Sequence, residues 1–337
     1  MTRLIKLLLL LLMGSFLACT DKEQGKDLPR IISTGNPAID GLTTKIATHP
    51  DDPKLFAERA TAYYEMEGYD EAIADMATAL KLDSNNVAYH YLLADVYLDY
   101  YKSHQALATM ERAVNIDPQN IESLLKLAEV QLILKQHESS LKTIDRVLKL
   151  NKNNAQAYLF MGLNFERKGD DGRAINSYQS AIENDAGLAE VHMKLGQLFA
   201  KSGNKIAIRY FDNAIAADPA NVMPLYAKAE YLHNNDQLDD ALELLRAIIL
   251  KDHQFVDAYF RTGVIYLEKD SLEKAYQQFN LVVQNDPSSA KGFYYRGFAS
   301  EMKGNFSNAK ADYEQALTFS PGYEKAKEAL QRFNKGK

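Results

Sequence analysis

The pattern of small, large apolar and polar residues repeats about every 34 residues between Pro53 and Tyr323. Seven units of 34 residues and one of 33 follow one another without a gap and cover 271 positions. These units are 53–86, 87–120, 121–154, 155–188, 189–221, 222–255, 256–289 and 290–323. Because a repeat array of this length can form one continuous body, the period takes precedence over a domain count based on length.

Tiny residues occupy two positions of every unit. The eighth position holds Ala60, Ala94, Ala128, Gly162, Gly196, Ala229, Gly263 and Gly297. The twentieth position, with one deletion allowed between Gly203 and Ala207, holds Ala72, Ala106, Ser140, Ala174, Ala207, Ala241, Ala275 and Ala309. Glycine inside a helix costs about 0.5–1 kcal/mol relative to alanine, so its recurrence in one column needs a packing reason. Two helices per unit that cross closely at these positions provide that reason.

Large residues occupy the complementary positions. The fourth position holds Phe56, His90, Leu124, Tyr158, His192, Leu225, Tyr259 and Phe293, and the twenty-fourth holds Met76, Met110, Ile144, Tyr178, Phe211, Leu245, Phe279 and Tyr313. Turn residues separate the helices, as at Gly68-Tyr69-Asp70 within a unit and at Asp117-Pro118 between units. The pattern predicts helix–turn–helix units and no strand.

This arrangement resembles the tetratricopeptide repeat, a helix–turn–helix module with the same length and the same small and large columns. The resemblance implies an all-α fold, a right-handed superhelical α-solenoid of about eight repeats with a capping helix at each end. One departure affects regularity: the turn at Gly203–Ile206 is a residue short. We therefore expect the superhelix to be less regular at this turn.

The two ends of the array need helices that cover its apolar faces, since a single unit cannot bury its own. Residues 36–52 carry apolar side chains at helical spacing, namely Ile39, Leu42 and Ile46. Residues 324–337 place Ala326, Ala329, Leu330 and Phe333 on one face and charged residues on the other. We expect both segments to be capping helices.

Residues 1–18 have the features of an export signal, a basic start followed by a short apolar run. That run is shorter than the roughly 20 residues of a membrane-spanning helix. Phe16-Leu17-Ala18-Cys19 resembles a bacterial lipoprotein signal, which implies cleavage before Cys19 and acylation of that residue. A secreted protein without lipid is the alternative. The polar residues 19–35 are expected to be the lipidated cysteine and a flexible tether.

This resemblance also implies a location in the bacterial cell envelope. Thr20, rather than aspartate, follows the cysteine, which by similarity to enteric lipoproteins favours the outer membrane, with the array facing the periplasm. We expect contact with the membrane only through the lipid, because no basic amphipathic helix is found in the array.

Composition removes several kinds of site. Cys19 is the one cysteine, so no thiolate cluster can bind a metal and no internal disulfide can form. The net charge of −6 becomes −8 without residues 1–18, which disfavours a nucleic-acid partner. Glu230 and His233 form half of a carboxylate di-iron motif, but no second half is found, and an ordinary surface is the preferred interpretation. The sequence thus predicts no enzyme, no cofactor and no metal.

A groove on the first helix of each unit is the predicted binding site. In tetratricopeptide arrays this helix lines a concave channel, and the second, fifth, ninth, twelfth and thirteenth positions share that face here. The predicted groove residues are Tyr91, Asp95, Asp99, Leu125, Glu129, Leu159, Leu163, Met193, Tyr226, Glu230, Phe260, Val264, Tyr294 and Phe298. The five positions carry a charge of −7, so the groove is expected to be acidic and aromatic. Alternatively, Tyr226, Phe260, Tyr294 and Phe298 pack against the next unit.

The preferred hypothesis is a non-enzymatic, membrane-anchored scaffold that binds a protein or peptide segment, basic and apolar in character, during assembly of an envelope complex. One alternative is a regulatory or adaptor subunit of a cell-envelope hydrolase or protease. Another is a self-associating scaffold, and so a homo-oligomer.

Overall fold

The computed structural model describes residues 34–335 and contains 18 α-helices and no strand within that range. Contacts divide the described chain into two compact units, 34–101 and 102–335. The predicted signal peptide 1–18 and the predicted lipidation site Cys19 lie outside the described residues. The all-α helical repeat solenoid expected from the sequence is confirmed.

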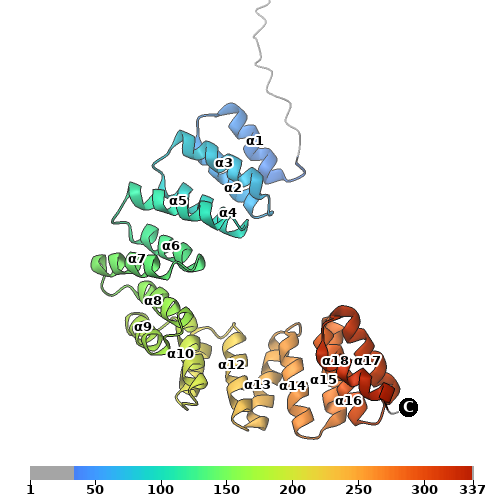
Figure 1. Cartoon of the computed structure of the whole chain (residues 1–337). Coiled ribbons are helices and arrows are strands. Elements are labelled where there is room, and N and C mark those ends of the chain that lie inside the picture. Colours follow the sequence, from blue (N-terminus) through green and yellow to red (C-terminus); the bar gives the residue numbers. More distant parts are fainter. Residues whose placement is uncertain (1–33, 336–337) are drawn as a thin grey trace, which may run out of the picture. The chain divides into compact units, whose positions relative to one another are not determined.

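Unit 1 contains α1 (Pro37–Thr48), α2 (Pro53–Tyr64), α3 (Tyr69–Leu82) and α4 (Val87–Asp99). Unit 2 contains α5 (Ser103–Ile116), α6 (Ile121–Ile133), α7 (His137–Leu150), α8 (Ala155–Arg167), α9 (Asp171–Asn184), α10 (Ala189–Lys201), α11 (Ala207–Ala217), α12 (Met223–Asn234), α13 (Leu238–Lys251), α14 (Val256–Glu268), α15 (Leu272–Asn285), α16 (Ala290–Met302), α17 (Phe306–Phe319) and α18 (Glu324–Lys335). We call the even-numbered helices α2–α16 the first helices and the odd-numbered helices α3–α17 the second helices (Figure 1).

The close helix crossing predicted from the small and large columns is confirmed. A Cβ atom built on Gly162 would lie 2.4 Å from the ring of Tyr178, and one on Gly196 would lie 2.6 Å from the ring of Phe211. Real Cβ atoms essentially never come this close to another atom, so the ring occupies the space that a side chain at the eighth position would need. Tyr178 is fully buried there. At these glycines the helix pair is therefore held by an aromatic ring packed on bare helix backbone, and where alanine stands at the eighth position the large side chain faces a methyl group.

Within unit 2 the first helices lie closer to one another than the second helices do. Helix α6 contacts α8 and α10 contacts α12, whereas no two consecutive second helices of this unit approach as closely. Figure 1 shows the helices of α12–α15 side by side in chain order. Within unit 2, the first helices α6 and α8 therefore share a face, and so do α10 and α12.

The turn between the two helices of each pair uses one backbone conformation throughout. The fifteenth position of the period has a positive φ at Glu67, Tyr101, Lys135, Gly169, Gly203, Asp236, Asp270 and Gly304. Only three of these are glycine, so tertiary packing holds five other residues in a region that L-amino acids seldom adopt. The short turn at Gly203–Ile206 removes the first turn of α11, which has 11 residues where α9 and α13 have 14.

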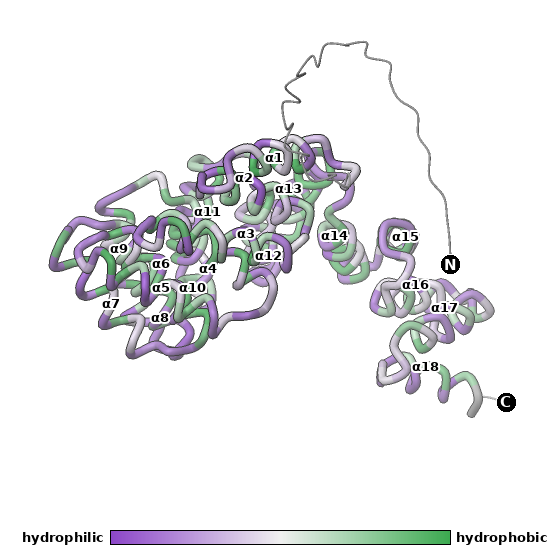
Figure 2. Tube along the Cα trace, turned by 90° about the horizontal axis from the view of Figure 1, so that it is seen from above, coloured by the Kyte–Doolittle hydropathy of each residue, from purple (hydrophilic) through white to green (hydrophobic). Residues whose placement is uncertain are grey.

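The end helices bury small numbers of apolar side chains. Ile39 of α1 is fully buried, and Ala326 and Ala329 of α18 are also fully buried. In Figure 2 hydrophobic and hydrophilic residues alternate along the helices instead of forming long apolar stretches. None of the helices described here is long and apolar enough to cross a membrane.

A glycine-to-alanine pair tests the crossing. We expect Gly162→Ala to destabilise the protein by about 1–3 kcal/mol, because the new methyl group must displace the Tyr178 ring. The matched control is Gly41→Ala on α1, where no atom lies within 4 Å of the new Cβ. It should stabilise by about 0.5–1 kcal/mol through helix propensity. Urea denaturation measures both, and two changes of the same sign would contradict the packing described.

Candidate functional site

The predicted groove residues of unit 1 lie on α4. Tyr91 and Asp95 are half-buried and Asp99 is exposed. The Tyr64 hydroxyl of α2 donates a hydrogen bond to the Asp99 carboxylate. That contact is one cause of a raised Tyr64 pKa, after burial of the ring. Asp99 is therefore engaged within unit 1.

Helices α6, α8 and α10 carry the next group of predicted residues. Leu125 and Met193 are half-buried, and Glu129 is exposed. Leu159 is only 4% exposed and belongs to the core between α8, α9 and α10, with Leu163 packed against the same cluster. The prediction that Leu159 lines an open groove is wrong, because this position packs inward on the neighbouring helices.

Phe260 is also a core residue. Its side chain is 8% exposed, and its ring centroid lies 5.7 Å from that of Phe279 and 5.0 Å from that of Tyr295. The Lys291 ammonium covers the ring at 3.6 Å from its centroid. Burial lowers the pKa of Lys291. The ring is thus enclosed by α15 and α16. The alternative interpretation, that this ring packs against the next repeat, is correct for Phe260. Val264 packs at the edge of the same cluster.

The aromatic residues of α12 and α16 are half-buried and have ring partners. Tyr226 meets Phe255 edge-on at 5.3 Å, and burial raises the pKa of its hydroxyl. Tyr294 contacts Phe298 of its own helix at 6.4 Å and Tyr323, which precedes α18, at 5.3 Å. These rings therefore form part of the packing between helices and are only partly accessible to a partner.

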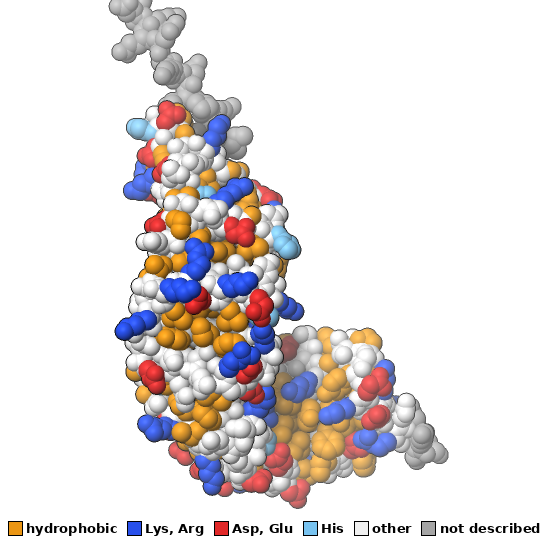
Figure 3. All heavy atoms as spheres, turned by 60° about the vertical axis from the view of Figure 1, so that its left-hand side comes forward, with side chains coloured by type: hydrophobic (Ala, Val, Ile, Leu, Met, Phe, Trp, Pro, Cys, Tyr) orange, Lys and Arg blue, Asp and Glu red, His pale blue; other side chains and the backbone are white. Residues whose placement is uncertain are grey.

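Three acids at the predicted groove positions are paired with a lysine or arginine of a neighbouring helix, and a fourth contacts a histidine. The pairs are Glu166 with Lys194, Glu230 with Arg261, Glu268 with His233 and Glu301 with Arg332. In Figure 3 basic and acidic side chains are interspersed over the visible surface. The charge predicted for the groove counted five positions of the period and left out the sixth, which holds Lys194 and Arg261. Each of these side chains pairs with a glutamate of the preceding first helix. The recurring spacing of 28 to 31 residues was the available signal.

A polar cavity lies on the shared face of the first helices. It has a volume of about 250 Å³ and is lined by Gln197, Ala200, Lys201, Phe211, Ala227, Glu230, Tyr231, Asn234 and Asn235 of α10, α11 and α12. Five of these residues occupy the ninth, twelfth or thirteenth position of the period. Gln197 and Asn234 are exposed, and neither makes a hydrogen bond within the described residues. Of the predicted groove residues, only Glu230 lines this cavity.

Buried tyrosines bond to two of the glutamates at the twelfth position. The Tyr178 hydroxyl donates to Glu166 at 2.5 Å, and the Tyr313 hydroxyl donates to Glu301 at 2.5 Å. Burial raises the pKa of both hydroxyls, and the adjacent carboxylate raises it further. Burial also raises the pKa of Tyr323 to about 12. These glutamates join the two helices of a pair and are not free for a ligand.

The three buried histidines contact other residues of the protein. His90 and His192, at the fourth position, are buried; His90 Nε2 lies 3.1 Å from the Ser84 carbonyl and His192 Nε2 lies 3.0 Å from the Ala186 carbonyl. His233 contacts Glu268 at 2.7 Å, while Glu230 pairs with Arg261. Among the described side chains, no group of three or more His, Cys, Asp or Glu residues could hold a metal ion.

Comparisons with known proteins agree with this architecture. A family model described as tetratricopeptide repeat matches residues 58–121, 193–254 and 226–290. Human protein O-mannosyl-transferase TMTC1 is 24% identical over 180 residues, 52% of this chain and 20% of that protein. Mouse tetratricopeptide repeat protein 14 is 32% identical over 103 residues, 28% of this chain and 13% of that protein. The chain therefore spans a fifth or less of the length of these relatives.

A solved structure also shares the fold. The crystal structure of PilW, a type IV pilus biogenesis factor, is similar with a TM-score of 0.54 at 19% identity, over 64% of this chain and 99% of that one. The helical repeat fold is one that supports protein–protein interaction scaffolds.

The buried tyrosines predict alkaline unfolding. In the unfolded chain a tyrosine ionises near pH 10, whereas Tyr178 and Tyr313 keep their protons to higher pH in the folded protein. Their contribution to stability is complete below pH ~10 and is lost as the pH rises through the folded pKa. We expect the urea concentration at the midpoint of unfolding to decrease as the pH is raised from 9 to 11. In the Tyr178→Phe variant this decrease should be less steep. A midpoint independent of pH, or equal slopes for the two proteins, would contradict this assignment.

Proposed function

Since the chain is a tetratricopeptide repeat protein, we propose that it is a non-enzymatic scaffold that binds a segment of a partner protein on the first helices of unit 2. The observation that carries this proposal is the cavity between α10 and α12, where side-chain amides without a hydrogen-bond partner among the described residues lie beside apolar surface. Pockets with a few convergent polar groups are the usual sites of ligand contact.

The chemistry of the cavity suits a peptide backbone. The side-chain amides of Gln197 and Asn234 each offer a donor and an acceptor, which is the set that a peptide group pairs with. The half-buried side chains of Ala200 and Ala227 add apolar surface beside them, while the Phe211 ring is buried. An extended segment can therefore bond through its main chain and place one apolar side chain against this wall.

Charge has a smaller role than the sequence indicated. Lys201 at the cavity edge pairs with Asp171 at 2.5 Å, and Glu230 pairs with Arg261. With these charges compensated, a basic partner gains little from steering by this cavity. The proposed partner is a protein segment recognised mainly through its backbone and one apolar side chain, and not a nucleic acid.

The anchoring part of the proposal rests on the sequence. Acylated Cys19 and a tether over residues 19–35 would hold the array at a bacterial membrane, the outer membrane facing the periplasm being the proposed location. PilW supports the fold alone. The complex that this chain helps to assemble is to be identified by capture of its partner.

A pair of arginine substitutions tests the cavity. Gln197→Arg combined with Asn234→Arg should weaken capture of the partner at least tenfold, because the long side chains fill the cavity and remove both amides. A photoreactive residue at Gln197 in whole cells, followed by mass spectrometry, identifies the captured protein. Pull-down with that protein then measures the effect of the substitutions.

The matched control carries the same charge change on the other helices. Gln277 and Gln284 are exposed on the second helix α15, so Gln277→Arg with Gln284→Arg should leave capture intact. An equal loss of partner capture in both double variants would overturn the proposed face. So would capture of the partner by a photoreactive residue at Gln277 and not by one at Gln197. Capture of a hydrolase or of a second copy would replace the assembly role by one of the alternatives.

The anchor is tested separately. Cys19→Ser should release the protein from the membrane fraction without changing its circular dichroism spectrum, because the predicted anchor precedes every described helix. Stable anchoring requires more than one acyl chain, which the lipoprotein modification supplies. Retention of the variant in salt-washed membranes would show that lipid on Cys19 is not the anchor.

A further inference from the structure

Beside four of the first helices, residues from three positions of the period lie close together. Two of them, the seventh and the twenty-third, come from the same repeat. The third is the twenty-fifth position of the preceding repeat, or the equivalent residue of the capping helix α1. We call this place the inter-repeat slot. Four slots contain a basic residue, and three of these hold it against a carboxylate.

In the first slot, within unit 1, Arg59 donates to both oxygens of Asp75 at 2.7 Å and to the Thr43 hydroxyl at 3.0 Å. Asp75 is buried. The arginine fork therefore fills the slot together with its own carboxylate, in the bidentate geometry that is strongest for this pair.

Two slots of unit 2 are filled in equivalent ways. Arg296 donates to the two oxygens of Asp312 at 3.0 and 2.6 Å, and to the side chain of Asn280 at 2.8 Å. Lys228 donates to Asp212 at 2.6 Å. In each case the base and the acid come from two of the three slot positions, so the charge is compensated inside the protein.

The fourth slot has the base but no acid. Its three residues are Arg246 of α13, Thr262 of α14 and Gln278 of α15. The short Thr262 side chain stands where Arg59 and Arg296 stand in the filled slots, and a neutral amide replaces Asp75 and Asp312. Arg246 makes no hydrogen bond or ion pair within the described residues.

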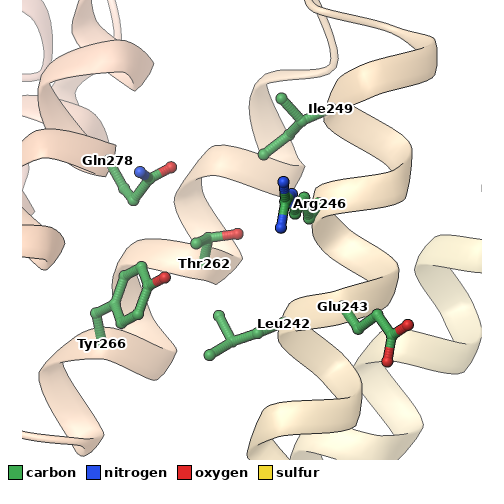
Figure 4. A pocket seen from close by; sticks show the side chains of 7 residues that line it. All are labelled: Leu242, Glu243, Arg246, Ile249, Thr262, Tyr266 and Gln278. Atoms are coloured by element: carbon green, nitrogen blue, oxygen red, sulfur yellow. The ribbon is translucent and has the colours of Figure 1, made fainter.

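A cavity of about 440 Å³ occupies this slot. It is lined by Leu242, Glu243, Arg246, Ile249, Thr262, Tyr266 and Gln278 (Figure 4). Leu242 and Ile249 form an apolar wall on α13, and Tyr266 and Gln278 lie across the cavity from it, while the carboxylate of Glu243 points away from them. The Lys274 ammonium lies 5.4 Å from the centroid of the Tyr266 ring and adds positive charge nearby.

We propose that this cavity binds a carboxylate carried on an aliphatic group, supplied by a ligand in place of the missing aspartate. Arg246 pairs with the carboxylate, Gln278 and the Tyr266 hydroxyl donate to it, and the aliphatic part packs on Leu242 and Ile249. The site shares no residue with the cavity between α10 and α12, and five of its seven lining residues belong to second helices. It is therefore independent of the proposed partner face.

Binding of N-acetyl-leucine, measured by saturation-transfer NMR titration on the full chain, tests the proposal. N-acetyl-leucinamide has the same aliphatic group without the charge, and it should bind at least tenfold more weakly. Arg246→Gln should weaken binding of the acid at least tenfold, whereas Arg209→Gln, an exposed arginine of α11 outside the cavity, should leave it unchanged.

An isosteric substitution supplies the missing acid within the protein. Gln278→Glu should abolish binding of N-acetyl-leucine, because the new carboxylate engages Arg246, and it should raise the melting temperature. Gln277→Glu, the exposed neighbour on the same helix, should do neither. No binding of the acid, or equal binding of acid and amide, overturns the proposal, as does binding that survives both Arg246→Gln and Gln278→Glu.

A peptide arm identifies the source of the carboxylate. The peptide acetyl-Gly-Gly-Gly-Leu with a free C-terminus is compared with N-acetyl-leucine. Tighter binding of the peptide assigns the site to a protein C-terminus. Equal binding assigns it to a small organic acid, and both results retain the same chemistry at Arg246.

Discussion

The structure depends on one contact repeated along the chain, a large side chain of a second helix packed against a glycine or alanine of the first. At Gly162, Gly196 and Gly263 the aromatic ring comes so close that no Cβ atom could fit. An aromatic side chain buries roughly 150–250 Å², which makes this contact the main apolar term of each helix pair. Because the crossing is fixed by volume, the orientation of all other side chains on the pair follows from it.

Charged residues are organised around this packing. Along the turns of unit 2, an acid at the start of a second helix meets a lysine at the end of the next first helix, as in Glu138 with Lys168 at 2.5 Å and Asp239 with Lys269 at 2.7 Å. Each exposed pair contributes about 0–1 kcal/mol, so packing and not charge sets the stability. A separate set of pairs, such as Glu166 with Lys194 and Glu230 with Arg261, engages acids of the predicted groove.

Function is proposed at the places where the regular pattern is interrupted. The shortened α11 lies beside the polar cavity at Gln197 and Asn234. The slot at Arg246 lacks the acid that its counterparts at Arg59 and Arg296 possess. A regular repeat satisfies its own contacts, and an irregular one leaves volume or a charge for another molecule.

The sequence by itself determined the helices, their pairing and the small and large columns, because these depend on residues close in the chain and on a period that eight units repeat. It also indicated that the short turn at Gly203–Ile206 would disturb the pattern. Only the tertiary structure decided which groove residues remain accessible. Phe260 and Leu159 are buried by neighbouring helices, and Glu166 and Glu230 are paired with bases about 30 residues away. The residues that bury or pair with them belong to other repeats and to other positions of the period. The pattern along a single helix face therefore does not reveal these contacts.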